Sequence, residues 1–361
     1  MMNFKKIFYL MLVLALLIFA SGCNKGKSTT KAPPDVRTGT EGLAVSFVAN
    51  NPPSLLVVEN GIDNPIKIVL QLNNKGAYPQ PNEVGGLAPE LGRVYISGFD
   101  QEIIDLPVKY ADTSQLALEG KSSINPNGGI DFKTFDGNIR ADLLNVEKYD
   151  PTFLATICYG YVTVVGPQVC IDPDPYSTIS QKKVCQVQDT TLSSQGAPVA
   201  VTSIKEEALA TRTQFRITIK NVGSGDIIKT ESFEKCNPSG TEKLAREDID
   251  KVYVQEVTIA GTSLQCGPFI EDLSESTRGY VRLINGEGTF TCKLNSQQYA
   301  STNTAYTTPL KVKLSYVYKT TAERKIQIKK EVSDLISGPG TGIGTTPSRP
   351  SIVPQPNELG P

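Results

Sequence analysis

The 361-residue chain contains no histidine, and this absence excludes several kinds of chemistry at once. Serine or cysteine nucleophiles activated by an imidazole, imidazole general bases and histidine-based zinc or copper sites all need a residue that the chain lacks. No G-x-S-x-G, Walker or dinucleotide-binding motif is present either. We therefore expect a protein that is not an enzyme, with no catalytic residue, no cofactor and no metal ligand.

An excess of charge of one sign is also lacking. The chain has 36 Lys and Arg residues against 37 Asp and Glu residues, a formal net charge of −1. Nothing in this balance would attract nucleic acid, so none is expected as a partner. Helix signals are scarce, and the best candidates for helical turns are Ser114–Leu118 and Thr241–Ile249.

What the chain does contain is a strand pattern that appears twice. Pro151–Thr163 reads PTFLATICYGYVT, and Thr308–Thr320 reads TPLKVKLSYVYKT. Every second residue is apolar or aromatic, which is typical of a strand with one face in a core. The tyrosines fall on that face, so burial is favoured over a carbohydrate-binding stripe. They are Tyr159, Tyr161, Tyr316 and Tyr318.

Three further pairs of segments repeat in the same order, at nearly the same spacing for the last two. They are Ile68–Gly76 with Phe215–Gly223, Val94–Ile96 with Val252–Val254, and Asn127–Phe132 with Asn285–Phe290. The change of spacing after the first pair predicts an extra segment in the second copy, within Asp226–Asp250. Four blocks in one order indicate a duplicated β-rich domain. Two unrelated all-β domains of similar composition are the alternative.

Turn signals complete the strand pattern. Asn74 and Gly76 match Asn221 and Gly223 at the ends of long alternating strands, and we expect Gly76 to adopt a positive φ. The predicted strands are 43–48, 54–58, 66–72, 93–97, 199–204, 215–220, 252–259, 280–284, 289–294 and 310–318.

This arrangement resembles the CARDB type of immunoglobulin-like β-sandwich, which occurs in tandem on microbial surface proteins. The openings of the two copies, Gly39–Leu43 and Gln195–Thr202, are similar to those of a family of archaeal secreted lipoproteins. The resemblance implies an all-β fold of two tandem immunoglobulin-like sandwiches and a cell-surface location. It carries no catalytic residue to transfer.

The N-terminus predicts export. Two lysines precede an apolar run from Ile7 to Ala20, followed by Ser21-Gly22-Cys23. A basic start, a short apolar run and small residues describe a signal peptide, and the last four residues resemble a lipobox in which Cys23 receives a lipid. An uncleaved membrane anchor is the alternative. We expect an extracytoplasmic protein anchored to the membrane surface by Cys23.

The predicted organisation follows from these boundaries. It comprises a signal peptide (1–22), a flexible tether (23–41), a first β-sandwich (42–165), a cysteine- and proline-rich connector (166–195), a second β-sandwich (196–336) and a disordered tail (337–361).

Without Cys23, six cysteines remain, an even number in an oxidising compartment. Disulfides are favoured over zinc because no C-x-x-C pair is present. Three cysteines fall in each half, so full pairing needs at least one bridge between the halves. None of the six is repeated between the copies, since Cys158 aligns with Ser315 and Cys292 with Thr134. The candidates are Cys158, Cys170, Cys185, Cys236, Cys266 and Cys292.

The connector raises two further expectations. Asp172 and Asp174 could bind Ca²⁺, although a plain Asp-Pro turn is favoured. On the strand Pro151–Thr163, the residues between the core positions include Leu154 and Val162, and such an apolar outer face needs a cover. We expect the connector to pack on the first domain, held by Cys170–Cys185 or by a bridge from Cys158, so that the two domains have a fixed relation.

These observations favour a non-enzymatic, lipid-anchored surface protein that binds a macromolecule, either a surface protein or a glycan, or spaces an assembly from the membrane. A ligand-capturing lipoprotein serving a transporter or surface enzyme is the alternative, and it would need a deep cleft between the domains.

Overall fold

The computed structural model describes residues 37–78, 92–113, 118–177, 183–270, 276–295 and 304–331. Strands are the main secondary structure of these residues, which also include two short 3-10 helices, η2 (Ala141–Leu143) and η4 (Thr230–Cys236). Among them, no helix is both long and apolar enough to cross a lipid bilayer. The strands are β1 (Leu43–Phe47), β2 (Leu55–Val58), β3 (Pro65–Asn74), β4 (Gly92–Ser97), β5 (Ile104–Asp105), β6 (Tyr110–Asp112), β7 (Ile130–Ile139), β8 (Lys148–Tyr149), β9 (Thr152–Val165), β10 (Gln168–Ile171), β11 (Thr190–Thr191), β12 (Val199–Leu209), β13 (Arg212–Asn221), β14 (Asp226–Ile228), β15 (Lys251–Ile259), β16 (Thr262–Ser263), β17 (Gln265–Gly267), β18 (Gly279–Arg282), β19 (Glu287–Asn295), β20 (Tyr306–Lys325) and β21 (Gln327–Lys330).

The strands form four sheets, and the largest belongs to both halves of the chain. The first half has a sheet of order β1-β3-β7-β5, and the second half has one of order β11-β12-β13-β19-β17. A nine-stranded sheet runs β16-β15-β20-β9-β4-β6, with β10 and β14 also paired to β20 and β18 to β15. A small sheet, β2-β21-β8, completes the fold. The two halves therefore share a sheet instead of standing as separate domains in tandem.

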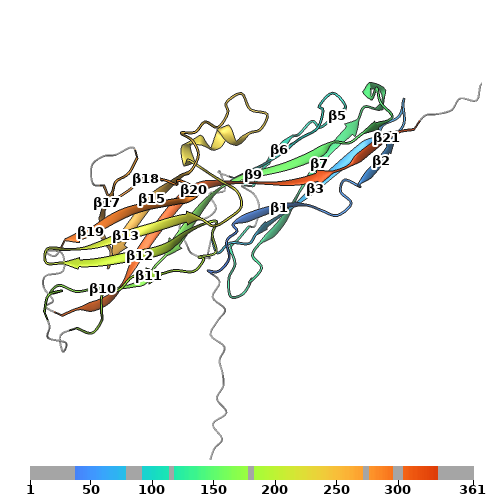
Figure 1. Ribbon diagram of the computed structural model, residues 1–361. Helices are drawn as coiled ribbons and strands as arrows, with labels where there is room; N and C mark the ends of the chain where they lie inside the picture. Colours follow the sequence, from blue (N-terminus) through green and yellow to red (C-terminus); the bar gives the residue numbers. More distant parts are fainter. Residues whose placement is uncertain are drawn as a thin grey trace, which may run out of the picture.

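A long antiparallel ribbon forms the axis of the elongated molecule (Figure 1). Strand β20 pairs with β9 from Val312↔Val165 to Lys325↔Thr152 without a register slip. The same register continues into β10 at one end and into the pairing of β21 with β8 at the other. At about 3.3 Å per residue, the 20 residues of β20 span roughly 66 Å. One strand therefore passes through both halves.

Each half is a β-sandwich whose core residues alternate along the strands. In the first half, Ile66, Ile68, Leu70 and Leu72 of β3 are buried in the same core as Phe153 of β9. In the second half, β13 and β20 contribute inward-facing residues in the same way, and all belong to one continuous core. The predicted all-β sandwich class is confirmed, because a period of two sets every second side chain on the buried face.

The two halves repeat side-chain contacts as well as strands. The Asn74 amide donates to the carbonyl of Tyr78 (2.8 Å), and the Asn221 amide donates to that of Gly225 (2.9 Å). The backbone N–H groups of the same two acceptor residues donate to tyrosine hydroxyls, those of Tyr161 and Tyr318 respectively. Equivalent hydrogen bonds at matched positions support duplication over chance similarity of strand composition.

Strand pairing corrects two of the matched blocks. Lys133 of β7 and Phe290 of β19 occupy equivalent register positions beside β3 and β13, so the match of Phe132 with Phe290 was wrong by one residue. A one-residue slip reverses the face of the sheet, and Phe132 is 52% exposed whereas Phe290 is buried. By the same register Cys292 corresponds to Phe135.

The second corrected block lies beside the tyrosine strands. Val94 pairs with Ile157, and Val254 pairs with Leu314, which is the counterpart of Ile157. Val254 is therefore the counterpart of Val94, and the match with Val252 was wrong by two residues. A shift of two residues keeps the same face, so the prediction of burial was unaffected.

The prediction for the connector was also wrong. Strand β10 pairs with the beginning of β20, and β11 pairs with β12, so these parts of the connector lie on the second half. The relation of the halves is fixed by the β9–β20 ribbon. The physical reason is that β9 and β10 run on together along one partner strand, which carries the chain away from the first half.

Candidate functional site at the junction of the two halves

Four tyrosines lie at the centre of the ribbon, a region that we call the waist. Tyr161 pairs with Tyr316 and Tyr159 with Tyr318, so the residues of each pair come from non-equivalent positions of the repeat. Such crossed pairing of repeat positions is what a local two-fold axis through the waist produces. The ring centroids are 6.2 and 6.1 Å apart, and all four side chains are buried, as predicted. They cannot serve as a carbohydrate-binding stripe.

The tyrosine hydroxyls explain why glycine follows both strand ends. Gly76 does not have the positive φ predicted for it. Its small size is needed instead, because a Cβ there would overlap the hydroxyl of Tyr161 and approach the carbonyl of Gly196 at 2.8 Å. Gly223 is in the same position relative to the hydroxyl of Tyr318.

We expect Gly76→Ala to lower the free energy of unfolding by about 3 kcal/mol or more, because it overpacks a buried hydrogen-bonded site. Gly166→Ala is the matched control, since a Cβ at Gly166 meets no atom within 4 Å. Its effect should stay within about 0.5 kcal/mol. Denaturant unfolding measures both variants, and equal stabilities would contradict the role of the Tyr161 hydroxyl.

The first described residues are held against the waist. The Arg37 guanidinium donates to the carbonyl of Val164 (3.0 Å), and Gly39 exchanges hydrogen bonds with Ser194 and Gly196. The flexible tether predicted to extend to residue 41 was therefore wrong for residues 37–41. Pairing between the openings of the two copies fixes this segment. The first described residues therefore lie at the middle of the elongated body (Figure 1).

A shallow groove lies beside this entry point. Its volume is about 240 Å³, and an ion pair between Lys75 and Glu41 (2.9 Å) lies at its rim. Ligand pockets for drug-sized molecules usually measure about 300–1,000 Å³. Among the described residues, this groove is therefore smaller than the deep cleft that ligand capture would need at the junction. Its other lining residues include Gly42, Leu43, Val45, Tyr159, Gly223, Tyr318 and Thr320.

The extra segment of the second copy forms a compact insertion at the position predicted for it. Strand β14 begins it by pairing with β20 from Asp226↔Lys319 to Ile228↔Val317, and η4 follows. Thr241–Ile249 contains no helix, so that prediction was wrong; the helical turn lies upstream, in η4. We call residues 226–250 the insertion.

One carboxylate organises the insertion. Burial alone would raise the pKa of Asp248, but hydrogen bonds from Ser232 and the Ala245 N–H, together with Lys235, lower it to about 2. The Ser232 hydroxyl donates at 2.6 Å and the Lys235 ammonium lies 3.0 Å away. The ionised carboxylate ties η4 to the last residues of the insertion.

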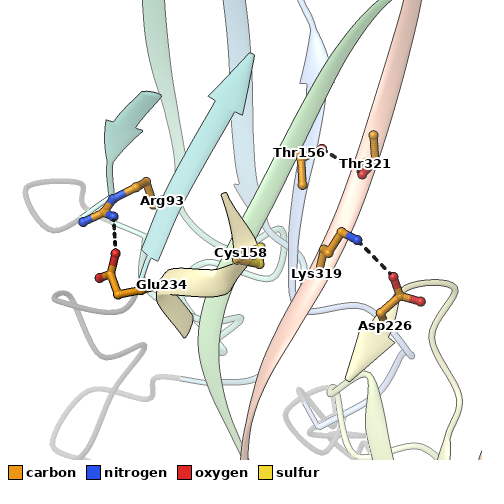
Figure 2. The surroundings of a disulfide bond; sticks show 8 residues. Arg93, Thr156, Cys158, Asp226, Glu234, Lys319 and Thr321 are labelled. Carbon is orange, nitrogen blue, oxygen red and sulfur yellow. Dashed lines mark hydrogen bonds and ion pairs between the residues drawn. A yellow bond between two sulfur atoms is a disulfide. The ribbon is translucent and has the colours of Figure 1, made fainter. Parts of the chain in front are cut away.

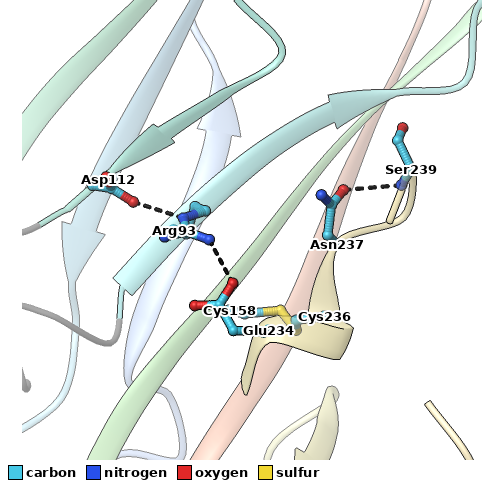
Figure 3. A network of polar contacts seen from close by, with 7 residues as sticks. All are labelled: Arg93, Asp112, Cys158, Glu234, Cys236, Asn237 and Ser239. Carbon is cyan, nitrogen blue, oxygen red and sulfur yellow. Dashed lines mark hydrogen bonds and ion pairs between the residues drawn. A yellow bond between two sulfur atoms is a disulfide. The ribbon is translucent and has the colours of Figure 1, made fainter. Parts of the chain in front are cut away.

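The insertion is bound to the first half by a disulfide and an arginine. Cys236 of η4 is bonded to Cys158 of β9 (Figure 2). Arg93 of β4 donates to Glu234 at 3.0 Å and to Asp112 of β6 at 2.7 Å (Figure 3). The insertion, and not the connector, covers the centre of the outer face of β9.

Aromatic rings extend this contact. The Arg93 guanidinium lies 5.2 Å from the ring centroid of Tyr110 and 5.7 Å from that of Phe233. Burial alone would lower the pKa of Arg93, but the hydrogen bond to Asp112 raises it, so the guanidinium stays charged. Arg93 thus joins β4, β6 and η4. Sequence analysis missed Arg93, Glu234 and Tyr110, because no local pattern relates residues so distant in the chain.

The disulfides agree with the prediction made from the number and distribution of the cysteines. All six form disulfides, Cys158–Cys236, Cys170–Cys185 and Cys266–Cys292, and the first is the bridge between halves that the count requires. Cys170–Cys185 closes the connector as expected, although on the second half. Cys23, the signal peptide and the tail (337–361) lie outside the described residues.

The two acidic residues of the connector form a turn. Asp172 accepts the backbone N–H of Asp174 (3.1 Å) and forms an ion pair with Lys183 (2.8 Å). The lysine ammonium occupies the side of Asp172 where a cation would bind, which favours the plain Asp-Pro turn over Ca²⁺. In the part of the chain that the structure describes, no cluster of His, Cys, Asp and Glu could hold a metal ion.

Comparisons with known proteins add little to this description. No protein-family model matches the chain, and no curated protein matches it. Among solved structures, the C-terminal domain of the Streptococcus pyogenes antigen I/II-family protein AspA is similar at 9% sequence identity and a TM-score of 0.19. That match covers 81% of this chain and 100% of the other. A similarity this weak carries no argument about function.

Proposed function

We propose that this chain is a non-enzymatic surface protein, anchored outside the cytoplasm by a lipid on Cys23, that binds a macromolecular partner. The observation that carries the proposal is the rigid body: one 20-residue strand runs through both halves, and the Cys158–Cys236 bridge connects them again. A body pre-organised in this way loses little conformational entropy when it binds. Three disulfides also suit an oxidising compartment outside the cytoplasm.

The position of the entry point favours binding over spacing. A spacer holds its partner at the end opposite its anchor. Here Arg37–Leu43 lie at the waist, so a lipid upstream of them would attach the folded body to the membrane at its middle and not at one end. Both ends and both outer faces would then be presented at a similar height above the membrane. The shallow groove at the waist gives no support to ligand capture.

Crosslinking on intact cells tests this proposal. Full-length protein in its native membrane should crosslink reproducibly to one or a few surface neighbours. Purified Cys23→Ala protein, added in excess, should compete for those neighbours, because it keeps the body and loses only the lipid. Membrane extraction followed by mass spectrometry should show lipid on Cys23 in the wild type. Neighbours that merely follow surface abundance and resist competition would contradict a binding function.

A further inference from the structure

A second pocket opens on the outer side of the contact between the insertion and the first half, near the polar network of Figure 3. Its volume is about 230 Å³. One wall comes from the loop before β6 and from β6 itself, with Pro107, Lys109 and Tyr110. The other wall comes from the insertion, with Asn237, Pro238 and Ser239. The pocket therefore exists only because the insertion is bound across the first half.

The lining combines an accessible aromatic ring with unused hydrogen-bonding groups. Tyr110 is 51% exposed. The Asn237 carbonyl oxygen accepts the N–H of Ser239 at 2.9 Å, and its NH₂ group makes no hydrogen bond within the described chain. Tyr95 is buried at the pocket wall, where burial raises the pKa of its phenol and the Arg93 guanidinium nearby opposes this only in part.

We propose that this pocket binds one pyranose unit of a glycan. The volume holds a single sugar ring and lies below the range for drug-sized ligands. A tyrosine ring can pack against the apolar face of a pyranose, while amide, hydroxyl and ammonium groups bind its hydroxyls. The inference rests on the proposed binding function and names the class of partner.

The walls of the pocket are held in place before any ligand binds. Cys236 lies next to Asn237 in sequence and is bonded to Cys158, and Arg93 holds Glu234 on the same turn. On the opposite wall, Lys109 donates to Gln101 at 2.6 Å. Because these walls are already fixed, the protein loses little conformational entropy when a sugar ring binds.

The test is titration calorimetry of the full-length, oxidised protein with four oligosaccharides. Maltoheptaose, cellohexaose and chitotetraose form the neutral arm, and an oligogalacturonate forms the acidic arm. At least one should bind, and Tyr110→Ala should weaken it at least about tenfold, the effect of losing a central aromatic contact. Tyr110→Phe should keep most of the affinity. If the acidic arm binds best, Lys109→Gln should weaken that arm selectively.

Phe132→Ala is the matched control, because Phe132 is exposed to the same degree on the outer face of β7, away from the pocket. It should leave binding unchanged, and each variant should show one cooperative unfolding transition well above the temperature of the titration. Absence of binding in all four titrations, or binding that Tyr110→Ala leaves intact, overturns the assignment. If the protein still crosslinks to specific surface neighbours in that case, only the assignment of a sugar to this pocket is wrong. If crosslinking to specific neighbours fails too, the proposed binding function is also wrong.

Discussion

Removal of the Cys158–Cys236 disulfide by a Cys158→Ala, Cys236→Ala double substitution is expected to lower the free energy of unfolding by about 4.5 kcal/mol. The bridge joins residues 78 apart, and in the chain-entropy model a loop of that length contributes about this much. Alanine is preferred to serine because Cys158 is fully buried and a hydroxyl there would need a partner. Denaturant unfolding under oxidising conditions measures the loss.

The position of the effect matters as much as its size. Hydrogen exchange should rise in η4 and in β6, which the insertion holds through Arg93, whereas the β9–β20 ribbon should stay protected. A Cys170→Ala, Cys185→Ala double variant is the control, because it opens a 15-residue loop in the second half. It should cost about 3 kcal/mol and leave exchange in η4 unchanged. Unchanged exchange in η4 of the first variant would show that the bridge does not hold the insertion.

Strands with one face in the core could be located from the sequence alone. Along β3 the buried positions alternate strictly, from Ile66 to Leu72, and the predicted range 66–72 lies inside the observed strand. The end of β20 could not be located. Residues 319–325 read KTTAERK and carry mostly polar side chains, because beyond Lys319 this part of β20 pairs with β9 alone among the described strands and much of its surface faces water.

The alternating pattern of apolar residues could not predict which strands pair with each other. Alternation shows that Tyr159 and Tyr316 are buried, but it does not show that β9 and β20 pair with each other. The repeat therefore suggested two separate sandwiches, whereas the structure joins them in one sheet. The connector was misplaced for the same reason. The apolar outer face of β9 indicated that some segment covers it, and the connector is nearest in sequence, whereas the insertion far downstream covers this face at Cys158.

Contacts at the candidate site show most clearly what could not be predicted from the sequence. Arg93 and Glu234 lie 141 residues apart in sequence and 3.0 Å apart in space. Cysteine parity did predict that one disulfide must join the halves, because a count is independent of distance along the chain. Its partners could not be predicted, since six cysteines allow fifteen pairings.

Glu206→Gln is expected to remove a loss of folding stability that the wild type undergoes as the pH rises. Glu206 of β12 points into the core of the second half, where it is 9% exposed, and one carboxylate oxygen accepts the backbone N–H of Cys170 at 3.2 Å. The other oxygen has no partner within the described chain. Burial raises the pKa of Glu206 from 4.5 to about 7, and the Cys170 N–H opposes this only in part.

The sign follows from proton binding. Between pH 4.5 and about 7 the folded protein holds a proton on Glu206 that the unfolded chain has released, so stability falls as pH rises through this window. The loss is complete above about pH 7 and amounts to at most about 3 kcal/mol. A neutral glutamine avoids it, so Glu206→Gln should exceed the wild type in stability at pH 8 and match it near pH 4.5.

Denaturant unfolding at these two pH values measures the difference directly. Glu207→Gln is the matched control, because its side chain is on the opposite, solvent-facing side of β12 and it should leave the pH profile unchanged. A Glu206→Gln variant that loses stability equally at both pH values would show that the carboxylate is ionised and usefully bonded in the folded state. In that event the backbone N–H of Cys170, not burial, would dominate the environment of Glu206.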